Sequence, residues 1–474
     1  MDTIFGNLSA AKGAESNRCG WADTVILIVA IAACVFVWSS QCSAREASSL
    51  YNENQPENSL SNFEHRLAMI WGRNNVWVPT PKVWVQYESD LGERSAVDFE
   101  NGVVELQILI GITDNPKSEI VLAHLRQGLY NLILGEPKDP VEMIKAINRE
   151  AKEDNQAKKE VRVYIVRQGD SLWKIAKRFG MQITELAKMN EMGTDEILQV
   201  GRPLKVKVFS SHELTLDTTK RPMATHPLLI DQIRMTDGRP VPHWMVKEFV
   251  TEVVNKQPPG TENVIGEDGI ERMAVVVSFK LVENHIEARA RKFQPIVLTH
   301  AVENNLDPAL IMAMIHTESF FNPRARSNAP AYGLMQVVPH TAGEEASIEI
   351  YGRKRRLTPQ FLYDPANNIQ LGTAYFNILK SRYMGSILDP TSRTYCAVAA
   401  YNAGASSVGR AFIPKKSINK ATAVINSLKP KDVYDRLVNA LPTRESRRYV
   451  RKVLTRVSKY SEWFSTTVGS VAFD

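Results

Sequence analysis

The stretch from Asp307 to Pro323, DPALIMAMIHTESFFNP, predicts a buried helix that carries a carboxylate near its end. Asp307 followed by Pro308 is typical of a helix start, an N-cap with proline at the first helical position, and Asn322-Pro323 ends the helix. Four apolar residues between them share one helical face: Leu310, Ile311, Met314 and Ile315. Glu318 continues that face, because residues three and four positions apart are neighbours on a helix.

The position of Glu318 bears on its chemistry. A carboxylate at the end of a buried stripe is poorly solvated, which favours the protonated form and raises its pKa. A general acid that works near neutral pH needs this property. A glutamate on such a face is also commonly a paired or helix-end residue, so at this point both interpretations of Glu318 remain.

Three further motifs follow the Glu318-Ser319 pair in order. They are Gly333-Leu334-Met335-Gln336-Val337, Ala400-Tyr401-Asn402-Ala403-Gly404 and Glu445-Ser446-Arg447-Arg448-Tyr449. Together the four resemble the motifs of the family 1 lytic transglycosylases, a group with a goose-lysozyme-like helical fold. The resemblance extends from about Ala290 to Tyr460, and it implies an all-α catalytic domain over residues 291–474.

This resemblance implies roles for named residues. Glu318 would act as general acid and then as base on a peptidoglycan strand, Tyr449 would hold the acetamido group or the glutamate, and Ser319 would support the glutamate by a hydrogen bond. Four residues would line the sugar cleft: Met335 through its backbone, Gln336, Tyr401 and Asn402. The expected reaction uses no water and leaves a 1,6-anhydromuramic acid end.

Two rival functions stay open. A goose-type lysozyme would use the same Glu318 but activate a water with a second acid, for which Glu344 and Glu345 are candidates. A catalytically idle scaffold that binds the cell wall is the other rival.

Residues 161–208 have a different pattern, strand, helix, helix and strand. The segment YIVRQGDSLWKIAKRFGMQITELAKMN, followed by ILQVGRPLKVK, resembles a LysM domain. The resemblance implies binding of N-acetylglucosamine-containing glycans through two loops: Gly169, Asp170, Ser171 and Ile197, Leu198, Gln199. Trp173 is expected in the small core.

The regions on either side of this module, residues 45–160 and 209–290, predict one α+β domain that the module splits. A helical pattern covers 60–71, strand-like alternation covers 83–87, and Asn101-Gly102 predicts a hairpin. A strand at 228–235, a helix at 246–255 and a strand at 274–281 are expected to complete the sheet. The segments IWG, VDFENG and NHIEARARKF resemble the N-terminal domain of the membrane-bound lytic murein transglycosylase C family.

The N-terminal residues 1–44 predict an export segment. Thr24 to Trp38 holds fifteen residues without a charge, which is short for a membrane-spanning helix and suits a signal peptide. Three outcomes remain open: lipidation at Cys34, cleavage after Ala44, or an uncleaved anchor. The first places the protein on the periplasmic side of the outer membrane; the others leave it in the periplasm or at the inner membrane.

Composition sets the outer limits. The 474 residues suggest about three domains at roughly 150 residues each, and four cysteines exclude a disulfide-stapled scaffold. Residues 291–474 hold 25 of the 58 Lys and Arg residues but only 13 of the 52 Asp and Glu residues, so the basic part is the catalytic domain. We expect it to approach the acidic stem peptides of the wall. No metal or other cofactor is expected, and the run Arg353–Arg356 is interpreted as a solvated loop, with no nucleic acid as partner.

Overall fold

The structure is a computed structural model that describes residues 57–88, 91–135, 160–179, 181–208, 227–256, 258–327, 329–415 and 417–465. The described residues from Ser59 onward group into one compact unit. The predicted export segment with Cys34, and the charged segment 142–159, lie outside the described residues. Within those ranges no helix combines the length and the apolar character needed to cross a membrane.

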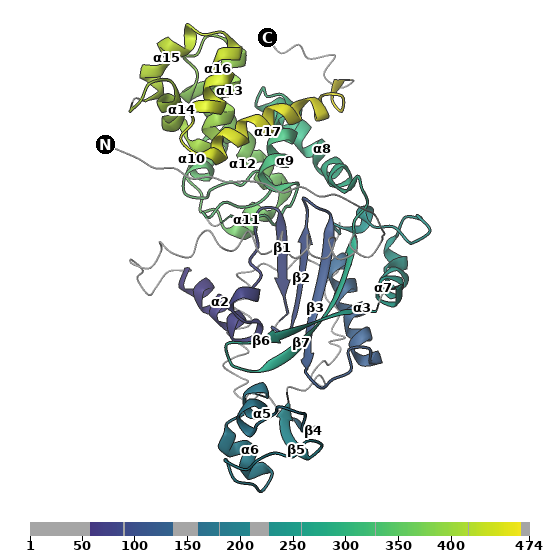
Figure 1. Ribbon diagram of the computed structural model, residues 1–474. Helices are drawn as coiled ribbons and strands as arrows, with labels where there is room; N and C mark the ends of the chain where they lie inside the picture. Colours follow the sequence, from purple (N-terminus) through teal and green to yellow (C-terminus); the bar gives the residue numbers. More distant parts are fainter. Residues whose placement is uncertain are drawn as a thin grey trace, which may run out of the picture. The chain divides into compact units, whose positions relative to one another are not determined.

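Five antiparallel strands form one sheet in the order β1-β2-β3-β7-β6 (Figure 1). Their bounds are β1 Val83–Tyr87, β2 Glu93–Asp98, β3 Val103–Gly111, β6 Gly260–Ile265 and β7 Glu271–Lys280. The hairpin predicted at Asn101-Gly102 joins β2 to β3, with Gly102 at a φ of 66°. In the next pair Leu106 of β3 lies opposite Val277 of β7, so chain segments from both sides of the module share this sheet.

In residues 209–290 one predicted strand does not form, and one strand forms that was not predicted. The strand predicted at 228–235 is wrong: this segment holds the short 3-10 helix η3, Ile230–Gln232, and a single bridge between Arg234 and Pro240. Proline has no backbone N–H, so a ladder cannot extend through it. The strand β6 escaped prediction because only Val264 in it is buried, which leaves no apolar alternation.

Helices cover both faces of the sheet. On one face α3 (Glu119–Leu134) and α7 (Val246–Lys256) pack on alternate strand residues such as Leu106 and Ile108 (Figure 1). On the other face Leu109 packs with Trp71 of α2 (Glu57–Trp71). Side chains alternate between the two faces of a strand, so β3 contributes to both cores. The short helices η1 (Arg73–Asn75) and η4 (His243–Met245) complete this region.

The module folds as predicted, with β4 (Glu160–Ile165), α5 (Leu172–Arg178), α6 (Ile183–Met189) and β5 (Pro203–Val208). Its core is small and holds residues from all four elements: Tyr164, Ile175, Leu186, Leu204 and Val206, among others. β4 and β5 pair only with each other, in a sheet of their own.

The expectation that Trp173 belongs to this core is wrong. The buried positions of α5 are Leu172, Ile175 and Ala176, which share one face of the helix. Trp173 does not lie on that face, so its side chain points outward. Its side chain is 59% exposed, and the ammonium of Lys177, one turn later, lies 5.2 Å from the ring centroid.

In the described ranges, residues 285–465 form helices and connecting loops and contain no strand. The helices are α8 His285–Glu303, α9 Pro308–Ser319, α10 Ala342–Tyr351, α11 Pro359–Tyr363, α12 Pro365–Ile378, η5 Leu379–Tyr383, α13 Pro390–Ala403, α14 Ala405–Phe412, α15 Ile418–Asn426, α16 Pro430–Ala440 and α17 Arg444–Ser461. Helix α9 lies in the middle of the core and packs along α17 and α8. The fold class expected from the sequence is confirmed: an α+β region with a sheet, a βααβ module and a helical region.

Candidate active site

Helix α9 places Glu318 where a buried helix reaches the surface. The carboxylate of Asp307 caps the first turn by accepting a hydrogen bond from the Ala309 N–H at 2.8 Å, with proline at N1. Every residue of α9 is buried except Thr317 and Glu318, which are partly exposed. The helix ends at Phe320, in the left-handed region at a φ of 51°.

The carboxyl group of Glu318 is protonated near neutral pH. Burial raises its pKa from 4.5 to about 8; the hydroxyl of Tyr449 lowers the pKa, and the negative charge of Glu445 raises it. A carboxylic acid that keeps its proton at pH 7 can donate it to a substrate oxygen.

Two phenols flank this carboxyl group. Tyr401 and Tyr449 both have pKa values well above 10, first because they are buried and then because Glu318 is close. The Tyr401 hydroxyl donates to the carbonyl of Met335 at 2.8 Å. The Tyr449 hydroxyl faces Glu318 but is buried without a hydrogen bond of ordinary geometry to any described residue. A polar atom in that state is available to a substrate.

The second motif forms a tight loop that α9 and α12 hold in place. The Ser319 hydroxyl donates to the Leu334 carbonyl at 2.8 Å and also lies 3.1 Å from the Ile315 carbonyl. The expected hydrogen bond from Ser319 to Glu318 is absent, because both of these contacts are to carbonyls. Ser319 therefore positions the loop and does not touch the acid.

Met335 and Gln336 occupy different places in this loop. Met335 is fully buried, and Asn368 of α12 accepts a hydrogen bond from its N–H at 2.8 Å. Gln336 adopts a left-handed φ of 50° and donates to the Gly333 carbonyl at 2.9 Å. Its side-chain oxygen is buried without a hydrogen-bond partner among the described residues, so it can accept a hydrogen bond from a ligand.

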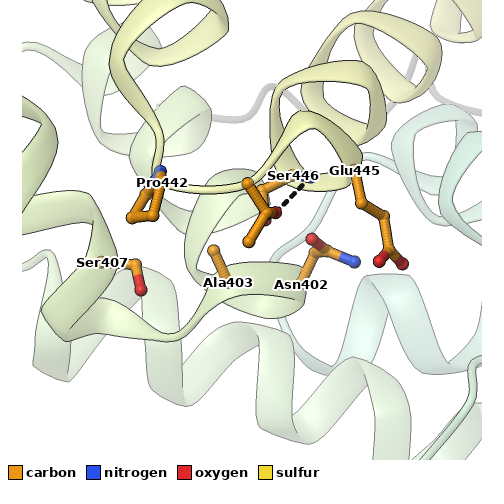
Figure 2. Close-up of a pocket in the computed structure, with 7 residues that line it drawn as sticks. Asn402, Ala403, Ser407, Pro442, Glu445 and Ser446 are labelled. Atoms are coloured by element: carbon orange, nitrogen blue, oxygen red, sulfur yellow. Dashed lines mark hydrogen bonds between the residues drawn. The ribbon is translucent and has the colours of Figure 1, made fainter. Parts of the chain in front are cut away.

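The third and fourth motifs line a pocket of about 230 Å³, and its Glu445 is the carboxylate whose charge acts on Glu318. Its lining comes from α13, from α14, from the segment that leads into α17 and from the first turn of α17: Asn402, Ala403, Ser407, Pro442, Thr443, Glu445 and Ser446. In Figure 2 the amide of Asn402 and the carboxylate of Glu445 point toward the same side of this pocket. The predicted sugar-binding residue Asn402 is thus joined by Glu445, which sequence reasoning gave no role.

Sequence reasoning also gave Asn368 no role. Its side-chain amide fixes the loop by three hydrogen bonds. It accepts one from the Met335 N–H and donates to the carbonyls of Tyr332 and Leu362 at 2.8 and 2.7 Å. Two features of the sequence could have pointed to these residues. Asn368 lies in the segment between the second and third motifs, and Glu445 is the first residue of the fourth motif.

The two acids proposed for the hydrolase alternative are engaged elsewhere. Glu344 forms an ion pair with Lys354, and Glu345 accepts a hydrogen bond from the Tyr383 hydroxyl at 3.2 Å. The carboxylate whose charge acts on Glu318 is Glu445.

In the module, the two predicted glycan loops meet at their bases. The Gly201 N–H donates to the Val166 carbonyl at 2.8 Å, and the Val166 N–H donates to the Arg202 carbonyl at 3.0 Å. Among the predicted binding residues, three have mainly local roles. Gly169 turns at a φ of 85°, Asp170 accepts from the Tyr164 hydroxyl, and Ser171 caps α5.

The second glycan loop offers more accessible groups. Ile197 is 89% exposed, Gln199 is also exposed, and Leu198 is half-buried and packs against the module core. An exposed apolar side chain on a loop suits contact with the apolar face of a sugar ring.

Comparison with known families matches three parts of the chain. Residues 296–424 match the transglycosylase SLT domain, residues 164–207 the LysM domain, and residues 49–152 the N-terminal domain of membrane-bound lytic murein transglycosylase C. The SLT match ends before Glu445 and Tyr449.

Similar proteins match along most of the chain. Membrane-bound lytic murein transglycosylases C from Yersinia pestis and Yersinia pseudotuberculosis are each 29% identical over 426 residues, 87% of this chain and 95% of the relative. Among solved structures, the lytic transglycosylase Slt from Pseudomonas aeruginosa is 28% identical, with a TM-score of 0.28, over 36% of this chain and 24% of that one.

Proposed function

We propose that this MltC-like lytic murein transglycosylase, which combines the MltC N-terminal domain, a LysM domain and an SLT domain, cleaves the glycan strands of peptidoglycan with Glu318 as its acid and base. The observation that carries the assignment is the position of Glu318 at the exposed end of a buried helix, with its pKa raised to about 8 between two buried tyrosines.

In the first step Glu318 donates its proton to the oxygen of the bond between N-acetylmuramic acid and N-acetylglucosamine. The carbonyl oxygen of the 2-acetamido group attacks the anomeric carbon of the muramic acid from within the substrate, so the protein need not supply a second carboxylate. Intramolecular attack benefits from a high effective molarity.

In the second step Glu318, now ionised, takes the proton of the 6-hydroxyl, whose oxygen attacks the anomeric carbon and displaces the acetamido group. The product is a 1,6-anhydromuramic acid end, and no water is consumed. Glu318 ends the cycle protonated, which its raised pKa favours.

The surrounding residues position the substrate in this proposal. Tyr449 donates its hydroxyl to the acetamido group or to the ionised glutamate, because that hydroxyl has no competing partner of ordinary geometry among the described residues. Gln336 and Asn402 bind sugar hydroxyls, and Tyr401 fixes the Met335 loop.

The rest of the chain brings this site to the wall. The LysM domain, residues 161–208, binds glycan through its 169–171 and 197–199 loops. The α+β domain consists of residues 45–160 and 209–290. The catalytic domain consists of residues 291–474. The relatives are named membrane-bound. Lipidation at Cys34 would give this chain the same attachment, on the periplasmic side of the outer membrane.

Mass spectrometry of digested sacculi tests the proposal. The parent protein is expected to release 1,6-anhydromuramic acid ends, and Glu318→Gln is expected to release at least about a hundredfold less, since the amide cannot donate or accept the proton. Glu344→Gln, a glutamate paired with Lys354, is the matched control and should retain the parent rate. Reducing ends in place of anhydro ends would establish a hydrolase, and an active Glu318→Gln would remove the catalytic assignment.

A further inference from the structure

A group of cations gathers at the end of α9, around Thr317 and Phe320. Its members come from the segment before β1 and from one side of α17, and we call them the basic cluster: Lys82, Arg448, Lys452 and Arg456. Arg456 donates to the Thr317 hydroxyl at 2.9 Å, directly adjacent to Glu318. Its guanidinium lies 5.1 Å from the ring centroid of Phe320, and the Lys82 ammonium lies 4.8 Å from the same centroid.

The three cations of α17 follow the helix away from the acid. Arg448, Lys452 and Arg456 are spaced four residues apart, so they share one side of the helix. Tyr449, which faces Glu318, adjoins the first of them. The three cations therefore run along α17 from the turn that carries Tyr449.

The charges that act on Lys452, in the middle of the basic cluster, are mostly positive. Burial lowers the pKa of Lys452, and so do the charges of Lys82, Arg456 and Arg448; only Glu100 opposes them. Glu100 already pairs with Lys82 at 2.7 Å. Three cations and one carboxylate act on Lys452, and that carboxylate already has a partner, so Lys452 keeps a net repulsion that an incoming anion would relieve.

Water and ligands can reach these groups. Arg448 is exposed, and the other three members are partly exposed. Partly desolvated Lys and Arg side chains bind carboxylates more strongly than fully solvated ones do, because less of their charge is screened.

We propose that the basic cluster is a carboxylate-binding subsite for the acidic stem peptide of the glycan strand. This inference rests on the proposed function, since the stem peptide is the acidic part of that substrate. It also gives the α+β domain a part in substrate binding, because Lys82 precedes β1 and reaches the end of α9.

Kinetics on two substrates test the subsite. Full-length Lys452→Gln and Lys82→Gln are compared with Lys420→Gln, an exposed lysine of α15, on uncrosslinked glycan strands with stem peptides and on strands stripped of them by an amidase. With stem peptides, KM of the cluster variants should rise about fivefold at unchanged kcat, the scale of a partly exposed ion pair. On stripped strands all variants should match the parent.

Two results would overturn the inference: an unchanged KM in both cluster variants, or an equal loss on both substrates, which would indicate a structural role. Lys82→Arg should restore the parent KM, and thermal unfolding of each variant checks the fold. A parent protein that releases no anhydro ends from either substrate would refute the proposed function itself, which is a distinct outcome.

Discussion

Glu318 holds its proton because burial raises the pKa of its carboxyl group more than the Tyr449 hydroxyl lowers it. Apolar neighbours on α9 and the rings of Tyr401 and Tyr449 exclude water, and the one charge that shifts the pKa of Glu318, that of Glu445, is of the same sign. No basic residue is among the groups that shift its pKa. The proton is thus a consequence of the environment, which three separate helices create.

A stability measurement follows from this shift. Between pH 4.5 and about 8 the folded chain holds a proton on Glu318 that the unfolded chain has released, so the associated stability is complete below pH 4.5 and is lost as the pH rises toward 8. Glu318→Gln removes this dependence. Its free energy of unfolding relative to the parent should increase from pH 5 to pH 8, by about 2 kcal/mol after allowance for partial exposure. Denaturant titrations at both pH values measure it, and a flat difference would contradict the raised pKa.

At the scale of elements, the loop after α9 depends on a glycine. Gly333 has a φ of 74°, and a methyl group there would lie 2.3 Å from the Asn368 side-chain nitrogen and 2.4 Å from the Leu362 carbonyl oxygen. Neither neighbour can move without breaking the hydrogen bond between them. The loop that carries Met335 and Gln336 is therefore set by α12 as much as by its own sequence.

Gly333→Ala should accordingly destabilise the chain by about 3 kcal/mol and lower kcat, since the loop must shift. The matched control is Gly352→Ala at the end of α10, which has a similar φ of 68° but no atom within 4 Å of the added methyl group. It should cost about 1 kcal/mol, from backbone strain alone. Thermal unfolding and sacculus digestion measure both effects, and equal losses in the two variants would show that the close contacts are unimportant.

The elements also show which local signals are reliable. Helix α9 begins at Asp307-Pro308 as predicted, because the cap is satisfied within one turn. Helix α12 begins in the same way at Asp364-Pro365. The strand expected at 228–235 does not form, although its residues are apolar. Leu229 and Ile233 are buried under the sheet helices without joining a ladder.

At the scale of the whole molecule, the module is a folded unit that contacts the sheet at the start of β7 and just after β3. It has a core of its own, and contacts to the rest of the unit include the Arg178–Glu271 ion pair and the packing of Ile112 on the module core. β3 and β7 pair without it. These features support a chain in which the module can be removed while the sheet persists.

Deletion of residues 161–208 from the full chain tests this arrangement. The shortened protein is expected to unfold cooperatively, with a Tm a few degrees lower from the lost contacts, and to cleave short soluble strands at the parent rate. Binding to intact sacculi should weaken by about tenfold, because a second binding module raises the effective concentration of the catalytic domain. Aggregation of the shortened chain would contradict the split-domain arrangement, and unchanged binding would remove the glycan role of the module.

The sequence by itself determined the helix that carries Glu318 in its last turn, the hairpin at Asn101-Gly102 and the βααβ module. Caps, turns and apolar periodicity act between residues a few positions apart, so they are legible along the chain. Only the tertiary structure directed the Ser319 hydroxyl to the loop, turned Trp173 outward and brought Lys82 to the end of α9. These outcomes depend on packing between elements that are distant in sequence, and no local pattern records which partner a side chain meets.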